Sequence, residues 1–310
     1  MPALAHEPEA ARPSSALAAI ATFAGLSRLH IVAIGALGTF TFGWLFTTAH
    51  AFGLAAVSGL DWFLVNLLNR VVDLKEDTAN GIAGTAFAAR HKRALLVVGF
   101  ALLFGSLAAV HLRAPQLLPL RLAFHVLGFA YNWRLLPGKR RIKELYFFKN
   151  FASAMGFLLT VFLYPLAAHG YGLDPTALAS GVTPATVLFA AGFFLLFELS
   201  YEVIYDLRDA HGDALAGVRT YPVVHGEAGA VCIIDGLLTG SLACLVVGYA
   251  LGHVPWRLFI MFAAPLLQLV LYKRALRRGI RASDCIRLTW LGAALLTAYH
   301  LWIYAGLPGT

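Results

Sequence analysis

The chain of 310 residues is too apolar and too weakly charged for a soluble domain. Hydrophobic residues make up 59% of it and charged residues 13%, whereas soluble domains carry about a quarter charged residues. The composition indicates an integral membrane protein. The net charge of +8 is explained by a basic rim at an anionic membrane surface. Binding of nucleic acid is not needed to explain the charge, and the sequence has no motif for it.

Residues 1–27 are expected to form a cytoplasmic tail, and residues 28–310 one membrane domain. The tail combines prolines and glutamates with an Ala-rich stretch and lacks the basic start of a secretory signal. Beyond it, apolar runs long enough to cross a hydrocarbon core of about 30 Å occur at 30–49, 52–72, 94–112, 116–133, 147–168, 184–205, 230–252, 255–272 and 288–306. In lipid, only helices and closed β-barrels pair all backbone N–H and C=O groups. The runs are too long for barrel strands, so we expect them to be helices. We predict an all-α bundle of nine transmembrane helices.

The basic residues gather in alternate loops, as the positive-inside rule requires. Of the 24 Lys and Arg residues, all but Arg113, Arg121 and Arg257 lie in the N-terminal region or near the ends of the second, fourth, sixth and eighth runs. We therefore expect the N-terminus to be cytoplasmic. After an odd number of spans, the C-terminus is expected outside.

The stretch "NRVVDLKEDTANG" (69–81) places an amide and carboxylates directly after the second apolar run. Asn69, Asp73 and Asp77 are spaced four residues apart, and because four residues turn about 400° around a helix, the three side chains share a face. A second acidic group ends the sixth run, in "LSYEVIYDLRDAHGDALAGVRTYPVVHG" (199–226). Its members Glu202, Asp206, Asp209 and Asp213 share a face if the helix continues past Gly212.

Two acidic groups at the membrane need compensation, because close carboxylates repel one another and are costly in lipid. Carboxylate and amide oxygens suit Mg²⁺, which commonly completes its coordination with substrate phosphate oxygens. Both groups follow even-numbered runs and so lie on the same, cytoplasmic side. The simpler interpretation is that each is a water-exposed helix end. Two spaced groups on one side favour a shared site for two Mg²⁺ and a diphosphate.

These motifs resemble those of the UbiA superfamily of intramembrane prenyltransferases, which have nine helices and two Asp-rich motifs. The first motif, N-x-x-x-D-x-x-x-D, is matched by residues 69–77, and the second, D-x-x-D-x-x-x-D, by residues 206–213. The stretch "GDALAGVRTYPVVHG" is similar to homogentisate- and chlorophyll-type members, and "YNWRLLPGKRRIKELYFFKN" to the family's segment before the fifth helix. The chain departs from the family pattern at Arg70, where many members have Asp, and in the loop 78–93, which lacks their Pro/Arg-rich segment.

The resemblance implies Mg²⁺-dependent transfer of a prenyl group from an isoprenyl diphosphate to an aromatic or quinol-type lipophilic acceptor, with release of diphosphate. It implies a central cavity that opens toward the cytoplasmic side. One metal would be held by Asn69, Asp73 and Asp77, and the other by Asp206, Asp209 and Asp213. Expected diphosphate contacts are Lys149, Arg219, Tyr131 and Asn132, and further cavity residues are Asn66 and Glu202.

Plainer roles compete with these assignments. Lys149 could extend to lipid headgroups, Arg219 could be a loop cation, and Tyr131 could belong to an interfacial aromatic belt. A membrane terpene cyclase, which needs no acceptor, would share the acidic motifs. A cation-coupled transporter is a third alternative, although it would be expected to show inverted repeats and acids near the middle of the bilayer.

Further polar residues inside the apolar runs include Asp61, His125 and Asp235. Asp61 is expected to line the cavity. His125 is expected to form a hydrogen bond to a neighbouring helix. Asp235 has no assigned role.

Overall fold

The computed structural model describes residues 23–25, 27–79, 84–169, 178–215 and 217–306. The described residues form helices and connecting turns, with one isolated β-bridge between Leu136 and Arg140. The helices of the first half are α2 (Leu29–Thr47), α3 (Phe52–Val72), α4 (Leu74–Ala79), α5 (Thr85–Arg90), α6 (Lys92–Arg113), η1 (Pro115–Leu117) and α7 (Leu118–Asn132). Those that follow are η2 (Ile142–Glu144), α8 (Tyr146–Leu158), η3 (Leu159–Leu163), α9 (Tyr164–Ala168), α10 (Pro184–Leu215), α11 (Tyr221–Ala250), α12 (Trp256–Phe259), η5 (Ile260–Phe262), α13 (Ala263–Leu276) and α14 (Ala282–Tyr304).

Seven helical segments in the described part of the chain are long and apolar enough to cross a membrane. They correspond to seven of the nine predicted runs, with α8, η3 and α9 together making one segment and α12, η5 and α13 another. The runs 116–133 and 288–306 are also helical, as η1 with α7 and as α14, but are not among the seven. An integral, multi-pass membrane protein is thus supported, while the count of nine spans stays a prediction.

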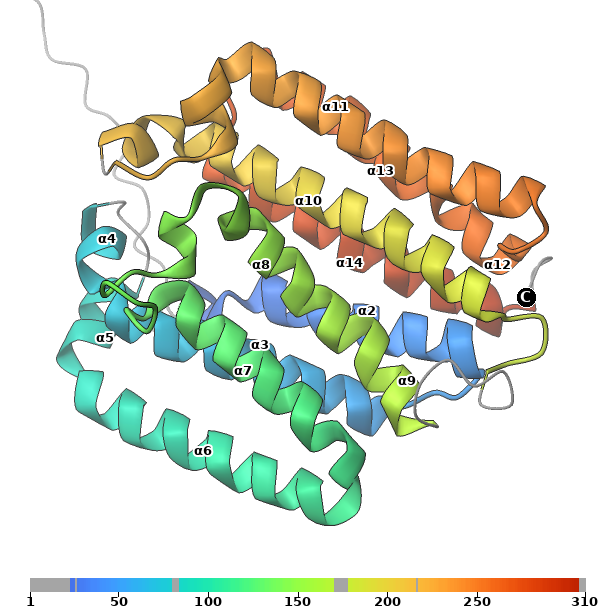
Figure 1. The fold of residues 1–310 in the computed structure, drawn as a ribbon, viewed down its shortest axis with the longest axis horizontal. Helices are drawn as coiled ribbons and strands as arrows, with labels where there is room; N and C mark the ends of the chain where they lie inside the picture. Colours follow the sequence, from blue (N-terminus) through green and yellow to red (C-terminus); the bar gives the residue numbers. More distant parts are fainter. Residues whose placement is uncertain (1–22, 26, 80–83, 170–177, 216, 307–310) are drawn as a thin grey trace, which may run out of the picture.

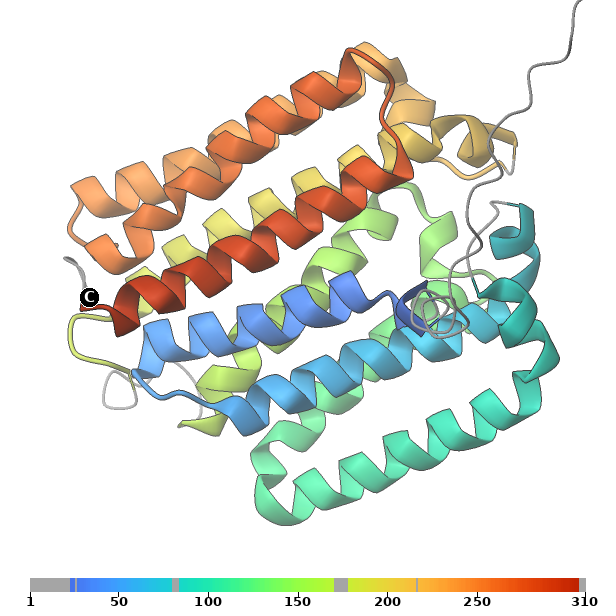
Figure 2. The same cartoon turned by 180° about the vertical axis from the view of Figure 1, so that it is seen from behind.

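The long helices run side by side in one bundle, with α6 at one edge and α11 at the opposite edge (Figure 1). Seen from behind, α2 lies between α3 and α14, with which it makes extensive contacts (Figure 2). The helices α4 and α5 and the connection from α10 to α11 lie at one end of the bundle, and α12 lies at the other (Figures 1 and 2). This arrangement brings the chain segments that carry the two acidic motifs to the same end.

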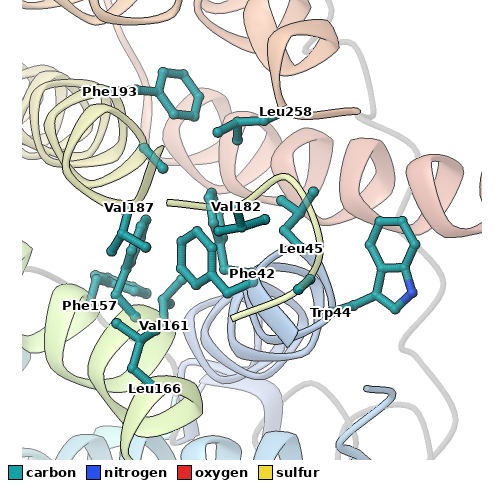
Figure 3. Close-up of a cluster of buried hydrophobic side chains, with 14 of the residues drawn as sticks. Phe42, Trp44, Leu45, Phe157, Val161, Leu166, Val182, Val187, Phe193 and Leu258 are labelled. Carbon is teal, nitrogen blue, oxygen red and sulfur yellow. The ribbon is translucent and has the colours of Figure 1, made fainter. Parts of the chain in front are cut away.

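An apolar cluster of buried side chains packs the interior of the bundle (Figure 3). Phe42 and Leu45 on α2 pack with Phe157 on α8, Val161 on η3 and Phe193 on α10. All five side chains are at most 3% exposed. Burial of large apolar side chains stabilises a fold by about 1.5–3 kcal/mol each in water, but in lipid the close fit of the side chains matters more.

The segment η3 is a single wide turn of π-helix within an otherwise α-helical stretch. Its Thr160 carbonyl oxygen accepts a hydrogen bond from the Thr39 hydroxyl on α2 (3.0 Å), which also lies 2.8 Å from Ser58 Oγ on α3. The Thr160 hydroxyl oxygen accepts a hydrogen bond from Trp62 Nε1 (3.1 Å). The π-turn therefore supplies the polar contacts that tie α2 and α3 to it.

A glycine lets α3 and α7 approach closely. A Cβ atom at Gly128 on α7 would lie 2.8 Å from Val65 Cγ1 on α3. The carbonyl oxygen of Gly128 also accepts a hydrogen bond from Asn69 Nδ2 (3.4 Å). This close approach is part of what positions Asn69.

Candidate active site

A cavity of about 1020 Å³ lies between α2, α3, α7, α8, α10 and α14. Its volume is at the upper end of the range for small-molecule sites, about 300–1,000 Å³. The apolar part of the wall carries the aromatic side chains of Phe42, Trp62, Phe124, Phe157, Phe193 and Phe194. Both acidic motifs line the cavity too, so one space combines a polar region rich in oxygen ligands with an aromatic interior.

The first motif stays on one face although α3 ends within it. Asp73 lies between α3 and α4, with φ −89° and ψ 14°. Hydrogen bonds of helical spacing nevertheless run through the break, from Asp73 N–H to the Asn69 carbonyl (3.0 Å) and from Asp77 N–H to the Asp73 carbonyl (2.9 Å). Asn69, Asp73 and Asp77 therefore all line the cavity, as their spacing predicts.

Basic side chains pair with the carboxylates of the first motif. Arg70 Nη1 lies 2.8 Å from Asp77 Oδ2, and Lys143 Nζ donates to Asp73 Oδ1 (3.0 Å). Arg141 Nη1 lies 3.6 Å from the same Asp73 oxygen. Arg70, which departs from the family pattern, thus pairs with a residue of its own motif. Lys143 and Arg141 come from the α7–α8 connection and were not assigned to the site from the sequence.

The α7–α8 connection is organised around Glu144. Arg141 Nε donates to Glu144 Oε1 (2.7 Å), and the Arg141 backbone N–H donates to Glu144 Oε2 (3.3 Å). Burial acts to raise the pKa of Glu144, but these hydrogen bonds outweigh it and hold the pKa below its ordinary value. Glu144 is therefore ionised at neutral pH and helps to orient the Arg141 side chain.

The second motif lies on a continuous helix, because α10 runs through Gly212 to Leu215. Lys149 Nζ on α8 bridges two of its carboxylates, donating to Asp206 Oδ1 (2.7 Å) and Asp213 Oδ2 (3.2 Å). Asn150 Nδ2 donates to Asp206 Oδ2 (2.8 Å). Asp209 pairs with its neighbour Arg208 through both carboxylate oxygens. Asp206, Asp209 and Asp213 all line the cavity.

The residues of the two motifs fit a hard divalent cation. They supply amide and carboxylate oxygens, and Asn69 Oδ1 is a buried acceptor that has no hydrogen-bond partner among the described residues. Among the described residues no group of three or more His, Cys, Asp or Glu side chains is close enough to hold a metal ion alone. Each motif can therefore supply part of a coordination shell, as is usual for Mg²⁺, which retains waters or takes oxygens from substrate phosphates.

Most of the other predicted residues also reach the cavity. Tyr131, Asn132, Lys149, Asn66 and Glu202 contribute to its wall. Within it, Glu202 Oε1 accepts a hydrogen bond from Ser153 Oγ (2.7 Å), and Asn66 Nδ2 donates to the Trp62 carbonyl (2.9 Å).

Arg219 is the exception. Its exposed side chain does not belong to the cavity wall in the described part of the chain, and its guanidinium lies 5.8 Å from the centroid of the Tyr146 ring. The neighbouring Val218 does line the cavity, so the chain passes the wall here while the Arg219 side chain lies at the Tyr146 ring instead. A diphosphate contact for Arg219 stays a prediction without support from its position.

The expectation that Asp61 lines the cavity is wrong. Asp61 is fully buried in an ionic network outside the cavity wall, where it accepts hydrogen bonds from Arg121 Nε (2.9 Å) and the Tyr164 hydroxyl (2.9 Å). Arg121, which the distribution of basic residues separates from the cytoplasmic loops, is itself fully buried and also donates from Nη1 to the Ser106 carbonyl (2.9 Å). His125 Nε2 lies 3.0 Å from Asp61 Oδ1, which confirms its expected contact with a neighbouring helix.

Besides Lys143 and Arg70, three further basic residues of the cavity wall were not identified from the sequence. They are Arg28, His30 and Arg208. Arg28 and His30 stand at the start of the first apolar run. At the end of an apolar run, the spacing of residues in the sequence does not tell whether a basic side chain faces the cavity or the lipid headgroups.

The chain matches the model of the UbiA prenyltransferase family over residues 18–292. A similar curated protein is digeranylgeranylglyceryl phosphate synthase from Pyrococcus furiosus, 29% identical over 128 residues. That match covers 34% of this chain and 46% of the relative, so it spans less than half of the relative's length.

Solved structures with under 25% identity share the fold. A UbiA homolog from Archaeoglobus fulgidus bound to GPP and Mg²⁺ has a TM-score of 0.66 at 14% identity, covering 92% of this chain and 99% of that one. The apo UbiA homolog from Aeropyrum pernix K1 has a TM-score of 0.63 at 16% identity, covering 89% and 98%. Because the family model matches residues 18–292 of the chain and both acidic motifs line one cavity, the chain belongs to the UbiA prenyltransferase family.

Proposed function

We propose that the chain transfers a prenyl group from an isoprenyl diphosphate to a lipophilic acceptor in a Mg²⁺-dependent reaction that releases diphosphate. The observation that carries this proposal is the single cavity, which joins two oxygen-rich motifs to an aromatic interior. The similar protein from Archaeoglobus fulgidus was solved with GPP and Mg²⁺ and also with DMAPP and Mg²⁺, which supports the same substrate class and metal here.

The two motifs divide the binding of metal in this proposal. Asn69, Asp73 and Asp77 would hold one Mg²⁺, and the carboxylates of Asp206, Asp209 and Asp213 would hold the other. When bound, Mg²⁺ supplies Lewis-acid neutralisation of the charge that develops on the leaving diphosphate.

The cations that pair with these carboxylates are proposed to bind the diphosphate. Lys149 and Lys143 each contact a motif carboxylate directly. A phosphate oxygen shared with that carboxylate's metal would therefore lie within reach of the same ammonium group. Tyr131 and Asn132, on the cavity wall at the end of α7, would orient the diphosphate or the acceptor.

The aromatic interior suits the reactive intermediate. The bond between the allylic carbon and the diphosphate oxygen breaks, and its electron pair leaves with the diphosphate. The faces of Trp62, Phe157 and Phe194 can stabilise the positive charge, and the apolar wall excludes water that would quench it. The acceptor then forms the new bond and loses a proton. Glu202 and Glu198, which lie on the cavity wall outside the metal-binding motifs in the described part of the chain, are proposed to accept it.

The acceptor is proposed to be aromatic or quinol-type, because such a compound presents an electron-rich carbon and partitions into lipid. A second class is an alcohol with an anionic head, as the name digeranylgeranylglyceryl phosphate synthase describes for the relative. Arg28 favours this class, because it lines the cavity and has no ion-pair partner among the described residues. Product analysis with each acceptor class separates the two.

Release of diphosphate by the purified chain in nanodiscs tests the reaction. Geranyl, farnesyl and geranylgeranyl diphosphate would be supplied with Mg²⁺ or with EDTA. We expect Mg²⁺-dependent release that falls more than about 100-fold in Asp73→Asn and Asp206→Asn, a larger loss than outer-shell changes usually cause. Glu227→Gln, an exposed acid on α11 outside the cavity wall, is the matched control.

Three outcomes would change the assignment. Equal rates in all variants would remove the motifs from the chemistry. Cyclic products without an acceptor would identify a terpene cyclase. No release with any acceptor would contradict prenyl transfer and favour the transporter alternative.

A further inference from the structure

A groove of about 660 Å³ lies between α11 and α13, separate from the cavity of the acidic motifs. None of its lining residues belongs to the wall of that cavity. On α13 it is lined by a stripe at helical spacing that continues just past the end of the helix: Val270, Lys273, Arg274 and Arg277, with Leu269 beside them. On α11 it is lined by Asp235 and Thr239.

The groove carries three basic side chains and one acidic side chain. Asp235 accepts hydrogen bonds from Lys273 Nζ (2.5 Å) and from the buried hydroxyl of Tyr272. An Asp inside an apolar helix is costly in lipid, so its pairing there explains how it is tolerated. The same pairing holds Lys273 in the groove.

Two positive charges of the groove remain uncompensated. Arg274 and Arg277 are exposed and have no ion-pair or hydrogen-bond partner among the described residues. A guanidinium offers five N–H donors in a planar fork that matches phosphate oxygens. The groove is therefore prepared for an anion with several oxygen acceptors.

The surface next to the groove is apolar. Leu266, Leu267 and Val270 on α13 are 39–49% exposed, and Val246 and Val247 on α11 are 44% and 48% exposed. By their positions in the chain, Leu266, Leu267, Val246 and Val247 lie nearer the α12 ends of the two helices. Lys273, Arg274 and Arg277 lie at the end of α13 that leads to α14. The turn from α13 to α14 is at the same end of the bundle as α4, which the distribution of basic residues assigns to the cytoplasmic leaflet (Figure 2).

We propose that this groove binds the phosphate headgroup of an anionic phospholipid, with its acyl chains along the apolar surfaces of α11 and α13. Arg274 and Arg277 would bind the phosphate, and Asp235 would position Lys273 beside it. A basic residue near an anionic membrane surface contributes about 1 kcal/mol to binding, which is about fivefold in affinity.

Lipid titration of the full chain in mixed micelles tests the site. Phosphatidylglycerol and phosphatidylcholine would be compared by native mass spectrometry, with the midpoint of thermal unfolding as a second readout. We expect Arg274→Gln combined with Arg277→Gln to weaken phosphatidylglycerol binding about 25-fold, as two lost charges imply. Arg90→Gln combined with Arg93→Gln, two exposed cations on α5 and α6, is the matched control and should retain full affinity.

A second variant tests the role given to the acid. Asp235→Asn raises the positive charge of the groove and should strengthen phosphatidylglycerol binding about fivefold. Weaker binding by a folded Asp235→Asn protein would overturn the charge arrangement proposed here. If the groove and control variants lost phosphatidylglycerol affinity equally, or if the chain did not prefer phosphatidylglycerol to phosphatidylcholine, the proposed site would be refuted. Such a result would show only a general attraction of the basic residues for anionic lipid. Displacement of the lipid by millimolar inorganic phosphate would identify a site for a soluble anion instead.

Discussion

The buried network around Asp61 gives the sharpest stability prediction. Asp61 on α3 and Arg121 on α7 are both fully buried, and their hydrogen bonds also reach Ser106 on α6 and Tyr164 on α9. Removing one partner leaves the other charge buried with only its hydrogen bonds and without its ion-pair partner, which costs about 3–5 kcal/mol. We therefore expect Asp61→Leu and Arg121→Met each to lower the free energy of unfolding by about that amount.

The double substitution distinguishes a coupled pair from two independent residues. If the residues acted independently, the losses would add to about 6–10 kcal/mol. Because the double variant buries no unpaired charge, we expect it to lose no more than either single variant, about 5 kcal/mol at most. Unfolding by denaturant in detergent micelles measures all three values.

An exposed ion pair serves as the control for this measurement. The side chains of Lys273 and Asp235 are 37% and 38% exposed, so Lys273→Met should cost about 1 kcal/mol or less. Additive losses in the double variant, or a cost below about 1 kcal/mol for either single variant, would refute the description of Asp61 and Arg121 as a buried compensated pair.

Three further substitutions probe the mouth and the packing of the cavity. Lys149→Met removes the bridging cation, so diphosphate release at saturating Mg²⁺ should fall roughly tenfold to a hundredfold. Because the Lys149 ammonium competes with Mg²⁺ for the same carboxylates, calorimetry should show tighter binding of Mg²⁺ alone to this variant. Weaker Mg²⁺ binding would contradict this competition. Arg70→Ala removes a buried cation from the first motif and should also tighten Mg²⁺ binding, and an unchanged dissociation constant would exclude that effect. Gly128→Leu forces a side chain against Val65, whose Cγ1 lies 2.8 Å from the added Cβ, and should cost about 1–3 kcal/mol in denaturant unfolding. Gly105→Leu has open space around it, and an equal loss there would show that crowding is not the cause.

The placement of both motifs on the cavity wall could be predicted because it depends on local periodicity. Residues four apart on a helix share a face whatever the helix packs against. This held for Asn69, Asp73 and Asp77 even though α3 ends inside the motif, because the hydrogen bonds continue through the break. It held for Asp213 because α10 passes through Gly212.

The residues whose positions were predicted wrongly or not at all are those whose contacts depend on how the helices pack and which way each helix faces. In lipid the outside of a helix is as apolar as its buried side, so the pattern does not tell which face of α3 lines the cavity. Asp61 therefore looked like a wall residue although Arg121 and Tyr164 bury it elsewhere. The contacts of Lys143 and Arg141 with Asp73 cross a separation of about seventy residues in sequence, which local periodicity does not report.

The π-turn η3 helps to set the depth of the cavity, because it holds a side chain of the cavity wall. Its Thr160 anchors Trp62, whose indole is part of both the cavity wall and the buried apolar cluster. A π-turn holds one residue more than an α-helix needs, so deletion of one residue within Leu159–Leu163 would convert the wide turn to an α-helical turn and leave the flanking helical segments in register. Deletion of Thr160 itself would remove the hydroxyl that accepts the hydrogen bond from the indole. The length of prenyl chain that fits could thus be altered by one deletion in a helix, without replacing any side chain that touches the substrate.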